Sequence, residues 1–443
     1  MGNATPLASP HRLPYNLRHS NERGVRAILP APDGGNEMTT RTMLKRGIAF
    51  GTFALSFGIG AAQAQDVVKI GLAGGFTGPI ASLATPMADA AQMAADQINA
   101  AGGVLKGGKI ELVRGDSACN PQNAVDAVGK LVNVDQVVAV FGPMCSGAFN
   151  AAASSVTIPA GVLQISASAT APTVTTLDDK DLAFRVVPSD AYQGEASARN
   201  LLAKGVKKVA VTYVNGDYGL GLAEAFKKAY EAGGGTITGF QGHEDAKASY
   251  RSELATLAGG GADTLVVFAY ANSSGLTVMR QALENGFFSK FVAGDGMKAD
   301  SLVKELGADN LKGLVISAPA ALPDTPAKAN FDKAYAARGG STDGVFVGQS
   351  YDSVFLLALA IEKAGSADRA KVAKALREVA MAPGEPILPG EWEKAKQLIA
   401  AGKDIDYKGV TGDHEFDKNG DVPGQFAEYV VKNGALAQAA MLK

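Results

Sequence analysis

Several apolar segments of this sequence are followed by polar side chains, some suited to a negative group and one suited to a positive group. Ser146, Ser168 and Thr170 each come just after a short apolar run, and Asp295 lies between two glycines after another. Hydroxyl groups and backbone amides suit a carboxylate, whereas an aspartate suits an ammonium group. A small molecule carrying both charges would satisfy both kinds of residue. The alternative is structural: the hydroxyl residues could cap helices, Asp295 could be a turn acid, and Tyr218 could be a packed edge residue.

The segment 137–147 shows how such residues could be positioned. Its first half, Val137–Phe141, is a continuous apolar run that predicts a strand buried on both faces. Its second half is a tight Gly-Pro loop that leads through Ser146 into a helix-like run from Ala148. In an open α/β sheet ligands bind at strand ends of this kind, and unpaired N–H groups at the helix start favour a carboxylate or phosphate.

Strand-like and helix-like segments alternate along most of the chain. The spacing is typical of doubly wound sheets, and a second series begins near residue 184, so we expect two similar α/β lobes. Residues 382–412 form an insert punctuated by Pro and Gly, and we expect a closing hairpin from 412–416 and 425–431. The expected strands are 66–72, 109–113, 137–141, 162–165, 184–188, 208–213, 236–240, 265–268, 291–293 and 314–317, and the expected late helices are 330–338, 347–363 and 368–379.

Catalytic and metal-binding motifs are incomplete. A hydrolase triad needs a base beside its nucleophile, but after residue 64 the sequence has only His243 and His414, which we expect on the surface. The run Gly103-x4-Gly108-Lys109 lacks the Ser or Thr that would hold magnesium, and residues 417–421 lack the glycine register of a calcium loop. We therefore expect no enzyme activity, no cofactor and no metal.

The first 64 residues have the pattern of a leader. Residues 1–37 show no periodicity and could precede the true start at Met38 or Met43. Residues 38–64 fit a cleavable signal peptide with a basic start, an apolar core and an Ala-x-Ala site. The alternative, a membrane anchor, is disfavoured because the apolar core falls short of the ~20 residues that span a bilayer. No cysteine follows the predicted cut, so we expect an exported protein without a lipid anchor.

Charge and cysteine content narrow the partners further. A formal net charge of −2 without a basic stripe argues against nucleic-acid binding. Cys119 and Cys145 both lie in the exported part, where one disulfide is the simplest expectation and two free buried thiols are the alternative. A metal pair is disfavoured because no histidine or third cysteine is near.

Taken together, these segments resemble the leucine/isoleucine/valine-binding protein family, the periplasmic receptors of branched-chain amino acid ABC transporters. The resemblance covers about residues 66–435 and implies a type I periplasmic binding protein fold, with two doubly wound α/β lobes joined by a three-segment hinge. It implies that residues 66–187 and 318–408 form lobe 1 and residues 188–317 and 409–443 form lobe 2. The motifs that carry it are Lys69-Ile70-Gly71, Thr77-Gly78-Pro79, Ile98–Gly103, Asp116–Pro121, Gly142–Ser146, Ile165–Pro172, Tyr218–Gly221 and Asp417–Asp421.

The resemblance also implies roles for the polar residues. Ser146, Ser168 and Thr170 would bind the ligand carboxylate, with Ser168 acting through its backbone, and Ala169 belongs to the same ligand-binding segment. Asp295 stands where the family has a glutamate that receives the ammonium group. It is one methylene shorter than that glutamate.

Four further residues complete the implied picture. Tyr218 matches a second-lobe tyrosine that closes over the ligand, and Phe346 matches an apolar pocket residue. Leu83 stands where the family often has a tyrosine in the side-chain pocket. The resemblance also implies a disulfide between Cys119 and Cys145.

The expected function is thus a monomeric periplasmic receptor that binds a leucine-like, isoleucine-like or valine-like small amino acid by hinge closure and delivers it to the membrane subunits of an ABC permease. Related receptors carry short amides, urea or aromatic acids, and these ligands remain alternatives. A receptor that serves a signalling partner would share fold and ligand. An exported amide hydrolase is the rival of a different class, but it would need a base near Ser146.

Overall fold

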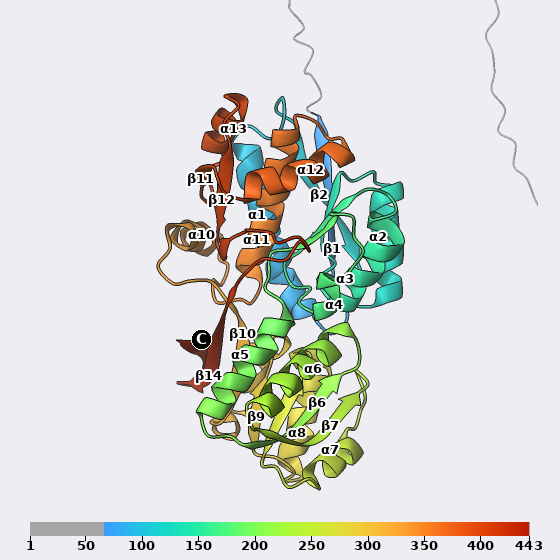
Figure 1. The fold of residues 1–443 in the computed structure, drawn as a ribbon, viewed down its shortest axis with the longest axis vertical. Coiled ribbons are helices and arrows are strands. Elements are labelled where there is room, and N and C mark those ends of the chain that lie inside the picture. Colours follow the sequence, from blue (N-terminus) through green and yellow to red (C-terminus); the bar gives the residue numbers. More distant parts are fainter. Residues whose placement is uncertain (1–65, 443) are drawn as a thin grey trace, which may run out of the picture. The chain divides into compact units, whose positions relative to one another are not determined.

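The computed structural model describes residues 66–442, so the predicted extension (1–37) and signal peptide (38–64) lie outside the described residues. Its first sheet has five parallel strands in the order β2-β1-β3-β4-β5 (Figure 1). Every residue of the central strands β3 and β4 is buried, as expected for apolar strands covered on both faces. The strands are β1 (Val67–Gly74), β2 (Lys109–Asp116), β3 (Ala139–Phe141), β4 (Leu163–Ser166) and β5 (Ala183–Arg185).

The helix α11 (Val347–Ala364) lies at the centre of the first core. Its residues from Tyr351 to Ile361 are all buried, because the sequence is apolar or small on every side of the helix and the helix packs between other elements. The predicted helix 347–363 is therefore confirmed to within one residue. The other helices in this part are α1 (Ala81–Ala100), α2 (Pro121–Asn133), α3 (Ser146–Ala152), α4 (Pro172–Thr175), α10 (Pro326–Ala337), α12 (Arg369–Ala380) and α13 (Trp392–Ala400).

The second sheet repeats this plan and adds two strands. Five parallel strands have the order β10-β9-β8-β6-β7, and β14 and β15 extend the β10 edge in antiparallel orientation. The strands are β6 (Lys208–Val214), β7 (Thr236–His243), β8 (Thr264–Phe268), β9 (Lys290–Ala293), β10 (Val315–Ala320), β14 (Gln425–Lys432) and β15 (Ala435–Met441), and the helices are α5 (Asp190–Ala203), α6 (Asp217–Ala232), α7 (Arg251–Ala258), α8 (Leu276–Glu284) and α9 (Asp300–Leu306).

The segment expected as an insert belongs to the first core. It contains a small sheet of β11 (Glu385–Ile387), β12 (Ile405–Gly409) and β13 (Gly412–Asp413). Trp392 is 1% exposed, packs its ring edge-on against Phe355 of α11, and donates its indole N–H to the carbonyl of Gly103 at 3.0 Å. The single tryptophan thus ties the insert to the end of α1.

The chain changes from one core to the other three times, so the expected two-lobed type I architecture is confirmed. The third change comes after Val422, later than the expected boundary at residue 408. The reason is that Val410, Phe416 and Val422 all pack into the core around the first sheet.

The expected closing hairpin is wrong. Residues Gly412–Asp413 pair with β12, and β14 pairs instead with β15, a strand that the sequence analysis did not predict. The two strands are joined through Asn433 and Gly434, whose φ angles are 52° and 81°. An Asn-Gly pair with positive φ at both positions is the favoured two-residue hairpin turn.

Candidate functional site

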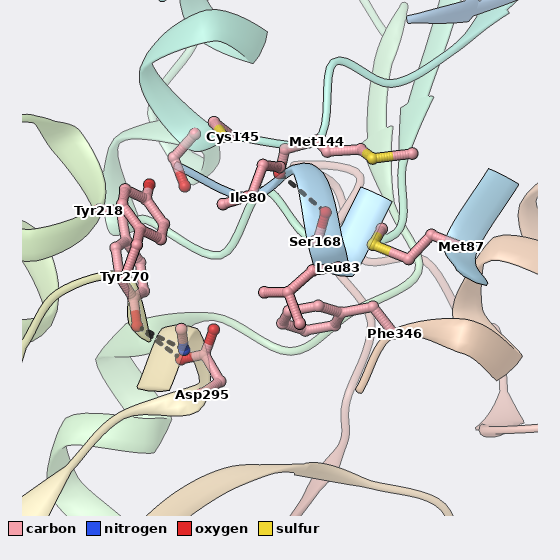
Figure 2. A pocket seen from close by; sticks show the side chains of 12 residues that line it. Ile80, Leu83, Met87, Met144, Cys145, Ser168, Tyr218, Tyr270, Asp295 and Phe346 are labelled. Carbon is pink, nitrogen blue, oxygen red and sulfur yellow. Dashed lines mark hydrogen bonds between the residues drawn. The ribbon is translucent and has the colours of Figure 1, made fainter. Parts of the chain in front are cut away.

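A cavity of about 340 Å³, counted with its mouth, lies between the strand ends of the two sheets (Figure 2). Both sheets share one strand order, in which the chain reverses direction across the sheet between β1 and β3 and between β6 and β8. Ligands bind outside the carboxyl ends of strands at such switch points. The cavity is lined by Ile80, Leu83, Met87, Met144, Cys145, Ser146, Ser168, Tyr218, Tyr270, Asp295, Gly296 and Phe346.

Most lining residues of the first lobe lie in the loops that follow β1, β3 and β4 or in the helices that begin there, and Phe346 directly precedes α11. The Ser146 hydroxyl accepts the N–H of Ala171 at 3.1 Å, and the Ser168 hydroxyl donates to the carbonyl of Met144 at 2.8 Å. These bonds run in both directions between the loop after β3 and the loop after β4. Each loop therefore fixes the position of the other, and Ser146 and Ser168 reach the cavity from a braced frame.

A disulfide braces the same frame from the β2 side. Cys119 and Cys145 are bonded, with their Cα atoms 5.4 Å apart, which confirms the expected pair. Cys145 lines the cavity and directly precedes Ser146. Asp116, at the end of β2, accepts the hydroxyl of Thr77 at 2.7 Å and so holds the loop after β1.

The second lobe contributes two stacked rings and a carboxylate. Tyr218, after β6, and Tyr270, after β8, stack with ring centroids 5.2 Å apart. The Tyr218 hydroxyl donates to Oδ1 of Asp295 at 3.1 Å and accepts the N–H of Gly296 at 2.9 Å. Burial raises the pKa of Tyr218 well above its usual value, so the hydroxyl keeps its proton and remains a donor. In Figure 2 the two rings and Asp295 lie on one side of the cavity, and Met87 lies across from them.

Asp295 is buried, with 3% of its surface exposed. Its Oδ1 also accepts the side-chain N–H of Gln193 at 2.8 Å. Burial raises the pKa of Asp295 to about 6, while the hydrogen bonds from Gln193 and Tyr218 favour the ionised form and limit the shift. This carboxylate consequently titrates close to neutral pH.

A second buried carboxylate, Asp190, lies near Asp295. Burial raises the pKa of Asp190 well above its usual value, and the negative charge of Asp295 raises it further. Neither carboxylate oxygen of Asp190 has a hydrogen-bond partner among the described residues. Asp190 therefore holds its proton more tightly than Asp295, and Asp295 is the acid of the pair that faces the cavity as a carboxylate.

The rest of the wall is apolar. Ile80, Leu83, Met87, Met144 and Phe346 bring only hydrocarbon, thioether and ring surface to the cavity. Phe346 has a φ of 63° and immediately precedes α11, so the backbone turns sharply where the ring enters the wall. Such a wall suits an apolar side chain, and the two methionines can adapt to its shape.

The structure brings most of the predicted site residues together. Leu83, Ser146, Ser168, Tyr218, Asp295 and Phe346 all line the cavity. Ala169 and Thr170 lie in the adjoining segment but are not among the residues that line it. The Thr170 hydroxyl is close enough to Asp190 to favour its ionised form, but it makes no well-aligned hydrogen bond with a described residue.

Sequence reasoning missed the polar pair of α5. Asp190 and Gln193 are both fully buried, one helical turn apart, at the start of a helix that follows a strand end. Two polar residues at that spacing, among alanines and a glycine, are a sequence pattern that could have indicated a buried polar site. Ile80, Met87, Met144 and Tyr270 were also not predicted, since apolar and aromatic lining residues resemble core residues in sequence.

Neither histidine of the described chain lines the cavity, and the expectation that both lie on the surface is wrong. His243 is 2% exposed beside the hydroxyl of Thr212, and burial lowers its pKa to about 4. His414 is 1% exposed, with Nε2 3.3 Å from a carboxylate oxygen of Asp352. Both imidazoles are structural.

The described residues, 66–442, lack two kinds of feature. They contain no grouping of three or more His, Cys, Asp or Glu side chains arranged to hold a metal ion. None of their helices combines the length and apolar character needed to cross a membrane.

Known proteins match this chain over most of its length. Residues 67–425 match the family model described as periplasmic binding protein. The leucine-, isoleucine-, valine-, threonine- and alanine-binding protein of Pseudomonas aeruginosa is 34% identical over 316 residues, which are 71% of this chain and 83% of that protein. The Leu/Ile/Val-binding protein of Escherichia coli K12 is 30% identical over 329 residues, which are 74% of this chain and 87% of that protein.

A solved structure agrees in fold. The branched-chain amino acid transporter substrate-binding protein of Streptococcus pneumoniae, in complex with isoleucine, has a TM-score of 0.71 and 27% identity, covering 85% of this chain and all of that one. The family model covers most of the chain, and two relatives of 30% identity or more match it over more than two thirds of their length, so this chain belongs to the periplasmic binding protein family, as the sequence resemblance indicated.

Proposed function

We propose that this protein is the periplasmic receptor of an ABC importer and binds a branched-chain or related small amino acid between its two lobes. One observation carries the proposal. Ser146 from the first lobe and Asp295 from the second line the same cavity, and the wall between them is apolar. A zwitterion with an aliphatic side chain matches all three parts of this lining.

Asp295 is the proposed partner of the ligand's ammonium group. Among the described lining residues none is Lys, Arg or His, so the carboxylate has no cation of its own in the cavity. A ligand ammonium beside Asp295 supplies that cation and favours the ionised form of the carboxylate. Tyr218, which donates to Asp295, lines the same part of the cavity.

The proposed carboxylate partners are the Ser146 hydroxyl and the backbone of the segment that starts at Ser168. Ser146 can donate its hydroxyl proton to a ligand while it accepts the Ala171 N–H. Ala169 and Thr170 remain proposed members of this set, since they belong to the same braced segment. No charged group is required, because several hydroxyl and amide donors together can bind a carboxylate.

The apolar wall and the relatives together favour an aliphatic ligand. Leu83 is smaller than the tyrosine that the family often has at its position, and Met87 and Phe346 line the same cavity. The two relatives described above are named as binding proteins for leucine, isoleucine and valine, and the matched structure contains isoleucine. We therefore place leucine, isoleucine and valine first among the ligands.

Contacts between the lobes support delivery by closure. Asn150 donates to Asp217 at 2.6 Å, Asn272 donates to Ser82, and Lys298 donates to the carbonyl of Asp343. Each bond joins a residue of the first lobe to a residue of the second. A permease that contacts both lobes at once would recognise this closed form. The receptor would act in the periplasm as a monomer.

A hydrolase using the same cavity is the weaker proposal. It would need a base at Ser146, and Asp295, the one acid among the described lining residues, comes from the other lobe and is bonded to Tyr218 and Gln193. The relatives are likewise named for binding.

A ligand panel tests the proposal. Thermal unfolding is followed with leucine, isoleucine, valine, alanine and threonine, and with a short amide, urea and benzoate as rivals. Binding to the native state alone raises the melting temperature. Leucine, isoleucine or valine should give the largest shift, confirmed by calorimetry. Stabilisation only by a rival would overturn the ligand class, and no stabilisation by any compound would overturn the receptor proposal.

A variant pair assigns the binding to the cavity. Asp295→Asn removes the charge that faces the ammonium group and should weaken binding by about 1.5–3 kcal/mol, roughly 10–100-fold. Asp263→Asn is the matched control, because Asp263 is an exposed acid of the same lobe that pairs with Lys290 far from the lining. Its affinity should equal that of the unaltered protein.

A further inference from the structure

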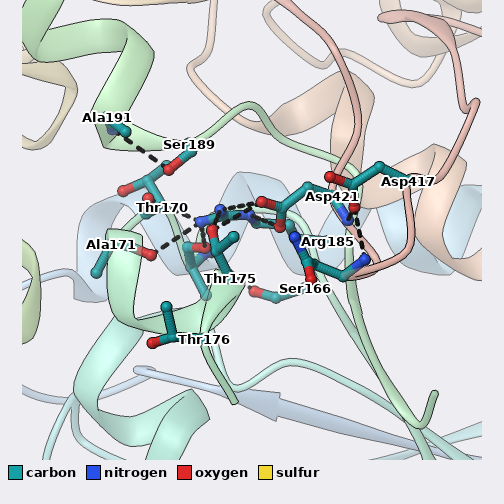
Figure 3. A network of polar contacts seen from close by, with 12 residues as sticks. Ser166, Thr170, Ala171, Thr175, Thr176, Arg185, Ser189, Ala191, Asp417 and Asp421 are labelled. Atoms are coloured by element: carbon teal, nitrogen blue, oxygen red, sulfur yellow. Dashed lines mark hydrogen bonds and ion pairs between the residues drawn. The ribbon is translucent and has the colours of Figure 1, made fainter. Parts of the chain in front are cut away.

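Arg185 lies at the end of β5, outside the cavity lining, and is fully buried. Its Nη1 donates to the carbonyls of Thr170 at 2.8 Å and Ala171 at 2.9 Å, and it lies 3.3 Å from the carbonyl of Ala169. One guanidinium nitrogen thus contacts three successive carbonyl groups of the segment after β4, and Figure 3 shows two of these residues, Thr170 and Ala171. That segment follows Ser168 and supplies the amide that binds Ser146.

The opposite edge of the guanidinium binds Asp421. Its Nε and Nη2 reach the two carboxylate oxygens at 2.7 and 2.9 Å, which is the bidentate arrangement of a planar guanidinium. The Thr175 hydroxyl bridges the two groups, accepting from Nη2 at 2.6 Å and donating to Asp421 at 2.7 Å. Figure 3 shows the guanidinium between the carbonyls on one side and Asp421 on the other.

Asp421 itself is held at the start of the third crossing between the lobes. The Asp417 carboxylate accepts the N–H of Asn419 at 2.8 Å and of Asp421 at 3.1 Å, so the turn fixes the backbone of Asp421. The carbonyl of Gly420 accepts the N–H of Arg185 at 3.1 Å. The crossing toward β14 follows directly after Val422, which still packs into the first core.

A buried ion pair is a poor way to gain stability, because desolvating two charges offsets most of their attraction. The geometry of Arg185 offers a different reason for it. Only a planar group with five donors can bind a carboxylate along one edge and a row of carbonyls along the other. A lysine at this position could neutralise Asp421 but could not hold the carbonyl row as well.

We propose that Arg185 and Asp421 are positioning residues for ligand binding: they hold residues 169–171 in their binding shape and attach that segment to the third crossing. The inference rests on the proposed function, in which the segment after Ser168 binds the ligand carboxylate. It also gives a role to the Asp417–Asp421 turn, whose acids hold the backbone and the guanidinium in place.

The test uses Arg185→Lys, with Asp421→Asn as the second variant and Thr175→Val as a milder one. Calorimetry measures the affinity for L-leucine or for the panel compound that the unaltered protein binds best. Carbon-13 shifts of the carbonyls of Ala169, Thr170 and Ala171 report directly on the hydrogen bonds from Arg185. We expect Arg185→Lys to weaken binding by about tenfold or more and to shift these carbonyl signals, with Thr175→Val between it and the unaltered protein.

Arg377→Lys is the matched control. Arg377 also pairs with a carboxylate, Asp181, at 2.6 Å and donates to a backbone carbonyl, that of Phe416, at 2.9 Å, but it makes none of the bonds to residues 169–171. Its replacement should lower the melting temperature without changing the affinity. Thermal unfolding of each variant separates loss of fold from loss of binding shape.

The outcomes are distinct. Unchanged affinity and unchanged carbonyl shifts in Arg185→Lys would overturn the inference, and so would an equal loss of affinity in Arg377→Lys, which would mark the pair as merely structural. If the unaltered protein binds no compound of the panel, the proposed function fails. The carbonyl shifts then decide the positioning role alone, with unchanged signals overturning it and changed signals supporting it.

Discussion

Tyr218 and Asp295, which follow different strands of the second sheet, share a hydrogen bond of 3.1 Å inside the cavity. The same hydroxyl accepts the N–H of Gly296 at 2.9 Å, so one phenol group fixes both the carboxylate and the backbone beside it. The bond favours the ionised form of Asp295. The aromatic cover and the proposed ammonium partner therefore form one unit.

Tyr218→Phe tests this unit. The change leaves the buried N–H of Gly296 without its acceptor, which should cost about 1–3 kcal/mol of stability in the ligand-free protein. It also removes a donor that favours ionised Asp295, so affinity for an amino acid should fall. Denaturant unfolding and calorimetry measure the two effects. Tyr270→Phe, which keeps the Tyr218–Asp295 bond, should leave both nearly unchanged, and similar losses in the two variants would contradict the prediction.

The pKa of Asp295 predicts how binding depends on pH. Burial raises this pKa to about 6, and only the ionised carboxylate attracts an ammonium group. As the pH falls from 7 to 5 the ligand-free protein takes up this proton, so the dissociation constant should rise by about tenfold. Calorimetry across this range in two buffers of different ionisation enthalpy should also detect proton release on binding at pH 5. A flat affinity profile would contradict the assignment, and Asp295→Asn should give one.

The raised pKa of Asp295 makes the stability of the ligand-free protein fall as the pH rises, whereas the affinity for an amino acid rises. Because the folded-state pKa lies above the ordinary value of 3.8, the folded protein holds the Asp295 proton more tightly than the unfolded chain does. This group's contribution to stability therefore falls as the pH rises from about 4 to about 6 and stays low above that. A ligand ammonium offsets this cost, so ligand-induced stabilisation should grow over the same interval.

The positions of the loops at the strand ends were predictable from sequence, because they depend on local residue patterns. The apolar run before Gly142 and the glycines around Asp295 locate their strand ends without tertiary information, and both loops reach the cavity. The strand β15 (Ala435–Met441) was missed because its Ala, Leu, Gln and Met residues favour a helix. The Asn433-Gly434 turn and pairing with β14 override that preference, and the Asn-Gly signal was present in the sequence.

Long-range pairs were not predictable from one sequence. Arg185 and Asp421 are 236 residues apart, and nothing in the local pattern of either residue indicates the other. The boundary after residue 408 was placed too early for a similar reason, since the burial of Phe416 depends on its contact with Phe184 in β5. Patterns of a few residues predict elements, but they do not identify which distant elements meet.

Ser146→Ala tests the carboxylate end of the cavity. The change removes a donor to the ligand and should weaken binding by about 1.5–3 kcal/mol, roughly 10–100-fold, as measured by calorimetry. Ser168→Ala is the contrasting variant, because Ser168 is proposed to act through its backbone. It should lose less affinity than Ser146→Ala. A larger loss of affinity in Ser168→Ala than in Ser146→Ala would assign the side-chain donor to Ser168 and the backbone role to Ser146. No loss in Ser146→Ala would remove Ser146 from the site.

Removal of the disulfide should affect both stability and binding. Cys119 and Cys145 are 26 residues apart, and closing a loop of this length contributes about 3 kcal/mol in the chain-entropy model. Because Cys145 lines the cavity and precedes Ser146, freeing it also loosens the proposed carboxylate site. The double variant Cys119→Ser/Cys145→Ser should therefore unfold at lower denaturant concentration and bind an amino acid more weakly. The unaltered protein treated with reductant should show the same two losses, whereas reductant should have no effect on the double variant. A double variant with full affinity would show that the hydrogen bonds between the loops after β3 and β4 hold Ser146 in place without the covalent link.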